Sequence, residues 1–326
     1  MSIPKIWITR KIHPEAMDLL ASQTELDVWP LETPPDLDTF LEKAPHIDGI
    51  LTLLSDPVTA QFIQAANNLR IISQMAVGYD NIDIDEATSR GIPVGHTPGV
   101  LTETTADFTW ALLMAAARRL AEADRQVRHG IWKPWGPDVL SGLDIFGSTL
   151  GIVGLGRIGM AVARRAQGFS MQVLYYDRNR NQTLEQELGL EYCDLNTLLQ
   201  KSDFISLHIY YSPEAHHLIG RQQFEQMKPT AILINTARGA VVDPEALTWA
   251  LQTNKIAAAG LDVFDPEPIP PDHPILKLDN LVIAPHIASA SRETRKKMAF
   301  IAAKNLLAGL AGQPLPFGAN PQVYGR

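Results

Sequence analysis

Short apolar runs alternate with helix-like stretches from residue 149 onward. The runs begin at residues 150, 172, 204, 231, 256 and 281 and read LGIV, QVLYY, FISLHI, AILI, IAAAGLD and LVIA. Near-continuous apolar strands separated by helices are typical of a parallel sheet that is covered on both faces. The pattern therefore predicts an α/β fold with a doubly wound parallel sheet in this part of the chain.

The first hundred residues repeat this rhythm on a smaller scale. The candidate strands there are KIWITR at residue 5, GILTLL at 49, RIISQMA at 70 and IPV at 92. A second, smaller α/β layer is predicted for this part.

Three further stretches complete the organisation. Residues 102–130 carry apolar positions near helical spacing and predict one long helix. The next segment, IWKPWGPDVLSGLDIFG, is rich in Pro, Gly and Trp and predicts an extended arm. Residues 291–310 form a last helical pattern that no strand follows. This helix must therefore pack against a layer that is already built.

The arm carries two tryptophans, Trp132 and Trp135. Aromatic residues are enriched at protein interfaces, which favours a surface that a partner buries. Single exposed tryptophans also occur on protein surfaces that bind no partner, so a merely solvent-exposed arm stays open as an alternative.

Composition narrows the class of partner. The 326 residues carry a net charge of −8 without a block of Lys or Arg, so there is no electrostatic footprint for nucleic acid or an anionic membrane. Cys193 is the only cysteine, so no disulfide within the chain and no zinc or other metal site is expected. The longest apolar run, 108–117, is too short to cross a bilayer, and the N-terminus lacks a signal-peptide core. We expect a cytoplasmic protein with a small-molecule partner.

A glycine-rich motif follows the strand at residue 150. Gly154, Gly156 and Gly159 form G-x-G-x-x-G between an apolar strand and an Ala-rich helix. Gly154 allows a tight turn, Gly156 lets backbone amides approach a pyrophosphate, and Gly159 lets the helix and the strand pack closely. This context predicts a Rossmann-type dinucleotide-binding domain.

The next strand ends in Asp177, at the spacing expected for the acidic residue that binds the ribose hydroxyls of NAD. Its charge would repel the 2′-phosphate of NADP. Arg178 and Arg180 follow and are the residue type that accommodates this phosphate, unless they only face solvent. NAD(H) is therefore favoured as the cofactor, and NADP(H) stays possible.

Three charged or titratable residues follow successive strands of the same sheet. Arg238 follows AILIN, Glu267 lies in the Pro-rich loop after the next strand, and His286 follows LVIAP. Ligands of open α/β sheets bind beyond the carboxyl ends of the strands, so we expect the three side chains at one edge. Each also has a structural interpretation. Arg238 would cap strand-end carbonyls or pair with Asp243, Glu267 would be a turn residue in a Pro-rich loop, and His286 would be a satisfied histidine at a strand end.

Together these three residues suit hydride transfer to a carbonyl. A guanidinium holds a carboxylate in a fork and polarises the neighbouring carbonyl, which is the role expected of Arg238. A histidine that titrates near neutrality supplies the proton that the carbonyl oxygen needs, and a carboxylate beside it favours the protonated ring. His286 is the predicted proton donor, and Glu267 tunes it.

Long motifs across nearly the whole chain resemble the D-isomer-specific 2-hydroxyacid dehydrogenases, and within them the glyoxylate and hydroxypyruvate reductases. The motifs are AVGYDNID at residue 76, TPGVLTETTADFTWALLMAAARR at 97, GIVGLGRIG at 151, NTARGAVVD at 235, GLDVFDPEP at 260 and APHIAS at 284. The resemblance implies NAD(P)H-dependent reduction of glyoxylate or hydroxypyruvate to glycolate or D-glycerate. It also implies that Arg238, Glu267 and His286 are the catalytic set.

The resemblance implies binding residues as well. Backbone amides at Val77 and Gly78 would hold the substrate carboxylate, with Leu54 nearby, and Arg238 and His286 would also contact the substrate. Asp262 would bind the nicotinamide carboxamide. The whole cofactor-binding set is then Thr104, Gly154, Leu155, Gly156, Arg157, Ile158, Gly159, Asp177, Arg178, Thr236, Ala237, Arg238, Asp262 and His286.

In this family the substrate-binding domain is discontinuous. The resemblance assigns residues 1–100 and 288–326 to a smaller flavodoxin-like α/β domain, and residues 101–287 to the dinucleotide-binding domain. This explains why the last helical pattern has no strand of its own. Such enzymes are typically homodimers joined through the helix and arm after Thr102, and they bind the substrate in a cleft between the domains that closes over it.

The chain departs from the family pattern at several positions. Tyr210, Tyr211 and Ser212 stand where relatives show Pro-Leu-Thr, and Ala215 replaces a Thr, so the wall on the adenine side differs. Val139 stands where some relatives place a substrate-facing tryptophan. The preference between hydroxypyruvate and glyoxylate therefore stays open.

Other functions of the same scaffold also stay open. A phosphite dehydrogenase would carry a lysine at the position of Val77, and a formate dehydrogenase would need an Asn-rich pocket beyond Asn81. An NAD-sensing corepressor, which is a binding module, can retain the Arg, the Glu and the His. It would differ by negligible turnover and by a hydrophobic peptide groove on the small domain.

Overall fold

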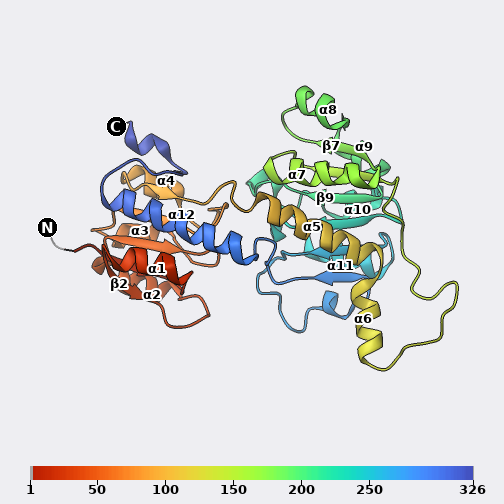
Figure 1. Ribbon diagram of the computed structural model, residues 1–326, viewed down its shortest axis with the longest axis horizontal. Helices are drawn as coiled ribbons and strands as arrows, with labels where there is room; N and C mark the ends of the chain where they lie inside the picture. The colour runs from red at the N-terminus through yellow and green to blue at the C-terminus, as the bar shows by residue number, and fades with distance from the viewer. Residues whose placement is uncertain (1–2, 326) are drawn as a thin grey trace. The chain divides into compact units, whose positions relative to one another are not determined.

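The computed structural model describes residues 3–325, and the chain divides into two compact units. The first unit comprises the residues up to Leu101 together with those from Ala290 onward, and the second comprises Thr102–Ser289. Each unit is built on its own parallel sheet (Figure 1).

The sheet of the first unit has five strands. They are β1 (Lys5–Ile8), β2 (Glu25–Val28), β3 (Gly49–Thr52), β4 (Ile71–Gln74) and β5 (Val94–Gly95). All neighbours pair in parallel in the order β2-β1-β3-β4-β5, which is the flavodoxin-like order. The sequence pattern missed β2 because this edge strand, ELDV, mixes polar and apolar residues and none of its residues is fully buried.

The helices of the first unit come from both ends of the chain. They are α1 (Pro14–Ala21), α2 (Leu37–Lys43), α3 (Ala60–Ala65), α4 (Ile84–Ser89) and α12 (Arg292–Leu310). The last of them, α12, contacts α1, β3 and β4, and is drawn in blue in Figure 1. Ser73 of β4 donates a hydrogen bond to the carbonyl of Ala302 in α12 at 2.8 Å. The prediction that this helix packs on a sheet built earlier in the chain is confirmed.

The sheet of the second unit has seven strands. They are β6 (Thr149–Val153), β7 (Gln172–Tyr176), β8 (Leu190–Tyr192), β9 (Phe204–Leu207), β10 (Ile232–Asn235), β11 (Ala258–Leu261) and β12 (Leu281–Ile283). All pair in parallel in the order β12-β11-β10-β9-β6-β7-β8. The strand order reverses between β6 and β9, and doubly wound sheets bind their ligands at such a switch point. The predicted Rossmann-type sheet is confirmed, with the short edge strand β8 added to it.

Helices cover both faces of this sheet. They are α5 (Thr102–Ala117) and α7 (Arg157–Ala166) on one face, and α9 (Leu195–Lys201), α10 (Arg221–Gln226) and α11 (Pro244–Gln252) on the other. Within β10, Ile232 and Ile234 pack on the side of α5 and α7, whereas Leu233 packs on the opposite side. Side chains of a strand alternate between faces, so a strand covered twice is apolar throughout. A further helix, α8 (Gln182–Leu188), precedes β8.

The single helix predicted over 102–130 is wrong, because the structure has two helices there. The first, α5, ends at Ala117, and α6 (Leu120–Arg128) begins after Arg119, whose φ of 51° is left-handed. The helix breaks where its burial ends. Half of the residues of α5 are buried, whereas no residue of α6 is. The following segment up to Gly147 has no regular structure, as the sequence predicts, and Trp132 and Trp135 in it are 79% and 89% exposed. Over residues 3–325, no helix is long and apolar enough to cross a membrane.

Candidate active site

The glycine-rich turn joins β6 to α7. Gly154 has a φ of +96°, where a side chain would be strained, and its amide donates to the carbonyl of Tyr176 at 2.8 Å. A Cβ at Gly159 would lie 2.1 Å from the carbonyl oxygen of Gly154, so the helix and the turn leave no room for a side chain. A Cβ at Gly156, by contrast, would have no heavy atom within 4 Å. The protein's own packing requires Gly154 and Gly159, whereas Gly156 leaves open space at a helix N-terminus, which is the kind of position where anions bind in proteins.

Asp177 lies directly beside this turn, after β7. One of its carboxylate oxygens accepts a hydrogen bond from the Leu155 amide at 2.8 Å, and the other accepts one from the Asn179 amide at 3.0 Å. The carboxylate is therefore held at the edge of the sheet on which the glycine-rich turn lies.

The two arginines after Asp177 have different surroundings. Arg180 forms a two-pronged ion pair with Glu185 at 2.9 and 2.8 Å, and its guanidinium lies over the Tyr192 ring. Hydrogen bonds from Arg180 and then from Tyr175 lower the pKa of Glu185 to about 2. The side chain of Arg178 is 72% exposed and lies 3.6 Å from Glu214. Arg178 is thus the arginine of the pair that is more accessible to a ligand phosphate.

A tight turn carries Arg238 out of β10. The side chain of Asn235 is buried and spans the turn, because its Nδ2 donates to the Arg238 carbonyl at 2.9 Å and its Oδ1 accepts from the Ala237 amide at 3.0 Å. A Cβ at Gly239 would lie 2.0 Å from the carbonyl oxygen of Phe264, so the two loops touch through their backbones. Asn235 was not among the predicted site residues. An Asn at the end of an apolar run, where its side chain can bond the backbone of the following turn, is the signal that could have found it.

The guanidinium of Arg238 is half-buried, and its Nη1 donates to the Ala237 carbonyl at 2.8 Å. This bond agrees with the structural interpretation of Arg238 as a cap on strand-end carbonyls. A guanidinium is also the side chain that binds a carboxylate through two parallel hydrogen bonds.

Glu267 and His286 form a hydrogen-bonded pair. Glu267 Oε2 lies 2.8 Å from His286 Nδ1, and Glu267 Oε1 accepts from the Phe264 amide at 3.0 Å. An ionised carboxylate only accepts hydrogen bonds, so it fixes the proton on Nδ1 and leaves Nε2 as the ring nitrogen for proton transfer. The side chains are 29% (His286) and 39% (Glu267) exposed, so the pair is accessible to a ligand.

Asp262 holds the turn that carries His286. Its carboxylate oxygens accept from the amides of Ile287 and Ala288, both at 2.7 Å, and its carbonyl accepts from the His286 amide at 2.8 Å. Burial raises the pKa of Asp262, and the two amide bonds oppose that shift. The predicted contact between Asp262 and the nicotinamide carboxamide stays a prediction.

The other predicted residues of the second unit lie on the elements around this edge. Thr104, half-buried, is in the first turn of α5, and Arg157 and Ile158 begin α7. Thr236 follows β10, and its hydroxyl lies 2.9 Å from that of Thr109 in α5. Leu54, Val77 and Gly78 belong to the first unit, where they follow β3 and β4. In the second unit, the turns after the neighbouring strands β10, β11 and β12 carry Arg238, Glu267 and His286. No group of three or more His, Cys, Asp or Glu in the described chain could hold a metal ion.

Comparisons with known proteins all point to one family. The profile described as D-isomer specific 2-hydroxyacid dehydrogenase, NAD binding domain, matches residues 110–288. The chain is 54% identical to a glyoxylate reductase of Korarchaeum cryptofilum, over 98% of this chain and 97% of that protein. It is 48% identical to a glyoxylate reductase of Aeropyrum pernix, over 99% and 98% of the two chains.

Solved structures agree with these relatives. A protein of Thermus thermophilus superposes with a TM-score of 0.91 at 44% identity, over 97% of this chain and 99% of that one. The NADPH-dependent glyoxylate/hydroxypyruvate reductase of Sinorhizobium meliloti superposes with a TM-score of 0.86 at 32% identity, over 98% of both chains.

Proposed function

The chain belongs to the D-isomer specific 2-hydroxyacid dehydrogenase family, and from this premise we propose that it reduces glyoxylate and hydroxypyruvate to glycolate and D-glycerate with NAD(P)H. The observation that carries the proposal is the Glu267–His286 pair, joined at 2.8 Å on a sheet edge that also carries the glycine-rich turn and Arg238. This edge combines a proton donor, a cation for a carboxylate and a dinucleotide motif.

The second unit supplies the cofactor-binding residues in this proposal. The open space at Gly156 would receive the pyrophosphate at the N-terminus of α7, and the Asp177 carboxylate would bind the ribose hydroxyls. When bound, the reduced nicotinamide supplies the hydride that the keto carbon of the substrate accepts. NAD(H) is favoured because Asp177 repels a 2′-phosphate, and the exposed Arg178 keeps NADP(H) possible.

The protein's own groups handle the proton and the carboxylate. His286 donates a proton from Nε2 to the carbonyl oxygen as the alcohol forms, and takes one back in the reverse reaction. Glu267 holds Nδ1 and stabilises the charged ring. Arg238 and the backbone amides of Val77 and Gly78 bind the substrate carboxylate, with Leu54 beside it.

We also propose a homodimer in the cytoplasm. The arm after α6 exposes Trp132, Trp135 and Phe146 over most of their surface. Aromatic side chains of this size are enriched where protein surfaces bury one another, so a second copy of the chain is the proposed cover.

Initial rates of NADH and NADPH oxidation with glyoxylate, hydroxypyruvate and pyruvate test the activity. Turnover of the first two and little of pyruvate is expected. Binding of NADH without turnover of any keto acid would overturn the proposal and favour the corepressor interpretation.

His286→Gln tests the assignment of the proton donor. We expect kcat to fall by about 10²- to 10⁴-fold, the usual contribution of a general acid, while NADH binding is retained. His129→Gln, at the C-cap of the exposed helix α6, is the control and should leave kcat unchanged. Turnover near the wild-type rate in His286→Gln would show that another group donates the proton.

A further inference from the structure

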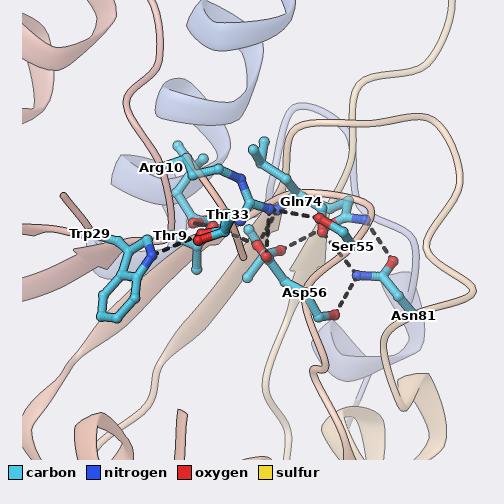
Figure 2. Close-up of polar contacts among 11 residues, drawn as sticks. Thr9, Arg10, Trp29, Thr33, Ser55, Asp56, Gln74 and Asn81 are labelled. Carbon is cyan, nitrogen blue, oxygen red and sulfur yellow. Dashed lines mark hydrogen bonds and ion pairs between the residues drawn. The ribbon is translucent and has the colours of Figure 1, made fainter. Parts of the chain in front are cut away.

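A continuous polar network in the first unit connects the loops that follow β1, β3 and β4 (Figure 2). Two of these loops carry the residues proposed to meet the substrate. The 53–56 loop after β3 contains Leu54, and the 75–80 loop after β4 contains Val77 and Gly78. The bonds described below all lie within this unit.

Asn81 bonds both ends of the 53–56 loop. Its Nδ2 donates to the carbonyls of Leu53 at 3.1 Å and of Asp56 at 2.9 Å. Its Oδ1 accepts from Gln74 Nε2 at 2.7 Å. One amide side chain thus connects the loop after β3 to the last residue of β4.

Gln74 connects the same loops from the other side. It is fully buried, and its Oε1 accepts from the Thr52 hydroxyl at 2.6 Å, at the end of β3. Its Nε2 also donates to the Gly78 carbonyl at 3.3 Å. Gln74 therefore connects the end of β3 to the backbone of the 75–80 loop.

Three successive carbonyls of the 75–80 loop accept hydrogen bonds from this unit. The carbonyl of Ala76 accepts from the Thr97 amide at 2.8 Å, that of Val77 lies 3.0 Å from His96 Nδ1, and that of Gly78 accepts from Gln74. The N–H of a trans peptide points opposite to its carbonyl. Holding the carbonyls of Ala76 and Val77 therefore sets the directions of the Val77 and Gly78 amides.

A buried ion pair closes the 53–56 loop. Asp56 is fully buried, and its carboxylate accepts from Arg10 Nη2 at 2.7 Å and from the Leu53 amide at 2.6 Å, with the Thr9 hydroxyl as a third donor. Arg10 Nη2 also donates to the Ser55 hydroxyl at 2.8 Å. Asp56 thus holds the backbone whose carbonyls Asn81 bonds.

We propose that Asn81 and Gln74 are positioning residues for the substrate carboxylate. They hold the 53–56 and 75–80 loops in one arrangement, so that the Val77 and Gly78 amides are aligned before an anion arrives and Leu54 stays beside them. The inference rests on the proposed function, in which these amides bind the carboxylate. Groups aligned in advance bind without the cost of ordering a loop, so loosening the network should weaken substrate binding.

Asn81→Asp is the variant that tests the coupling. It keeps the size and the acceptor of Asn81 but cannot donate to Leu53 and Asp56. We expect the KM for glyoxylate to rise at least tenfold, which is about 1.4 kcal/mol, with a smaller change in kcat and an unchanged Kd for NADH.

Asn320→Asp is the matched control in the same unit. Asn320 is buried, whereas Asn81 is half-buried. Like Asn81, it donates twice, to the Thr88 hydroxyl and the Ile92 carbonyl at 3.0 Å each, and it accepts from the Val94 amide. A purely structural role predicts a lower Tm in both variants and no specific change in KM. Equal KM values for the two variants would overturn the inference.

Gln74→Met gives a second test if Asn81→Asp does not fold. It keeps the approximate volume of Gln74 and removes its bonds to Asn81, Thr52 and Gly78, so the KM for glyoxylate should rise while the Kd for NADH is retained. A wild-type KM in this variant would refute the coupling. The absence of keto-acid turnover by the wild-type enzyme would overturn the proposed function and this inference together, whereas wild-type turnover with unaltered variants would overturn this inference alone.

Discussion

Replacing Gly156 by alanine should separate cofactor binding from folding stability. Gly156 has φ −72° and ψ −167°, an extended conformation that alanine adopts without strain, and the new methyl group would meet no heavy atom within 4 Å. Alanine is a poorer N-cap for α7 than glycine, but it also lowers the entropy of the unfolded chain, which is worth about 0.4–1 kcal/mol. The two effects oppose one another, so the free energy of unfolding should change by less than about 1 kcal/mol.

Cofactor binding should respond much more strongly. The methyl group would occupy the space through which a pyrophosphate approaches the helix N-terminus. Loss of one hydrogen bond to a charged group costs about 1.5–3 kcal/mol. At 1.4 kcal/mol per factor of ten, the Kd for NADH should rise roughly ten- to 150-fold.

Gly159→Ala is the contrasting variant. Its Cβ would lie 2.1 Å from the Gly154 carbonyl oxygen and 3.2 Å from Ile152 Cγ2, so overpacking should lower the free energy of unfolding by about 1–3 kcal/mol. NADH titration followed by fluorescence and urea denaturation of both variants measure the two quantities. Wild-type affinity in Gly156→Ala would refute the assignment of this space to the pyrophosphate.

Three further predictions concern other parts of the chain. Asp177→Ala should lower the ratio of kcat/KM for NADH to that for NADPH, and an unchanged ratio would contradict its assignment to the ribose. Asp56→Ala removes the buried carboxylate that pairs with Arg10, whose side chain is 12% exposed, and should lower the free energy of unfolding, measured by urea denaturation, by about 3–5 kcal/mol. A loss below about 1 kcal/mol, typical of an exposed ion pair, would contradict this. Desolvation lowers the pKa of His208 from 6.5 to about 3, so between these pH values only the unfolded chain takes up the proton and stability falls as the pH falls. His208→Gln should flatten the stability profile in that window, and an unchanged slope would exclude His208 as its source.

The local pattern of the sequence was sufficient for the sheet and its glycine-rich turn. Central strands such as β6 and β10 are apolar at nearly every position because helices cover both faces, and this is visible in a single sequence. The edge strands β2 and β8 could not be found in this way, because charged residues interrupt their apolar positions, in ELDV and in LEY. The break at Arg119 also escaped the pattern, since it depends on where α5 stops being covered.

Sequence order alone predicted that Arg238, Glu267 and His286 follow successive strands, because parallel strands place their carboxyl ends at one edge. Only the tertiary structure revealed the groups that hold such residues in place. Asn235 spans the Arg238 turn, and Asp262, which directly follows β11, bonds the turn of His286. Asn81 bonds carbonyls more than twenty residues earlier in the chain. Motif spacing predicts which residues follow a strand. It cannot predict a hydrogen bond between segments that are distant in the sequence, because that bond forms only when the folded sheet brings the segments together.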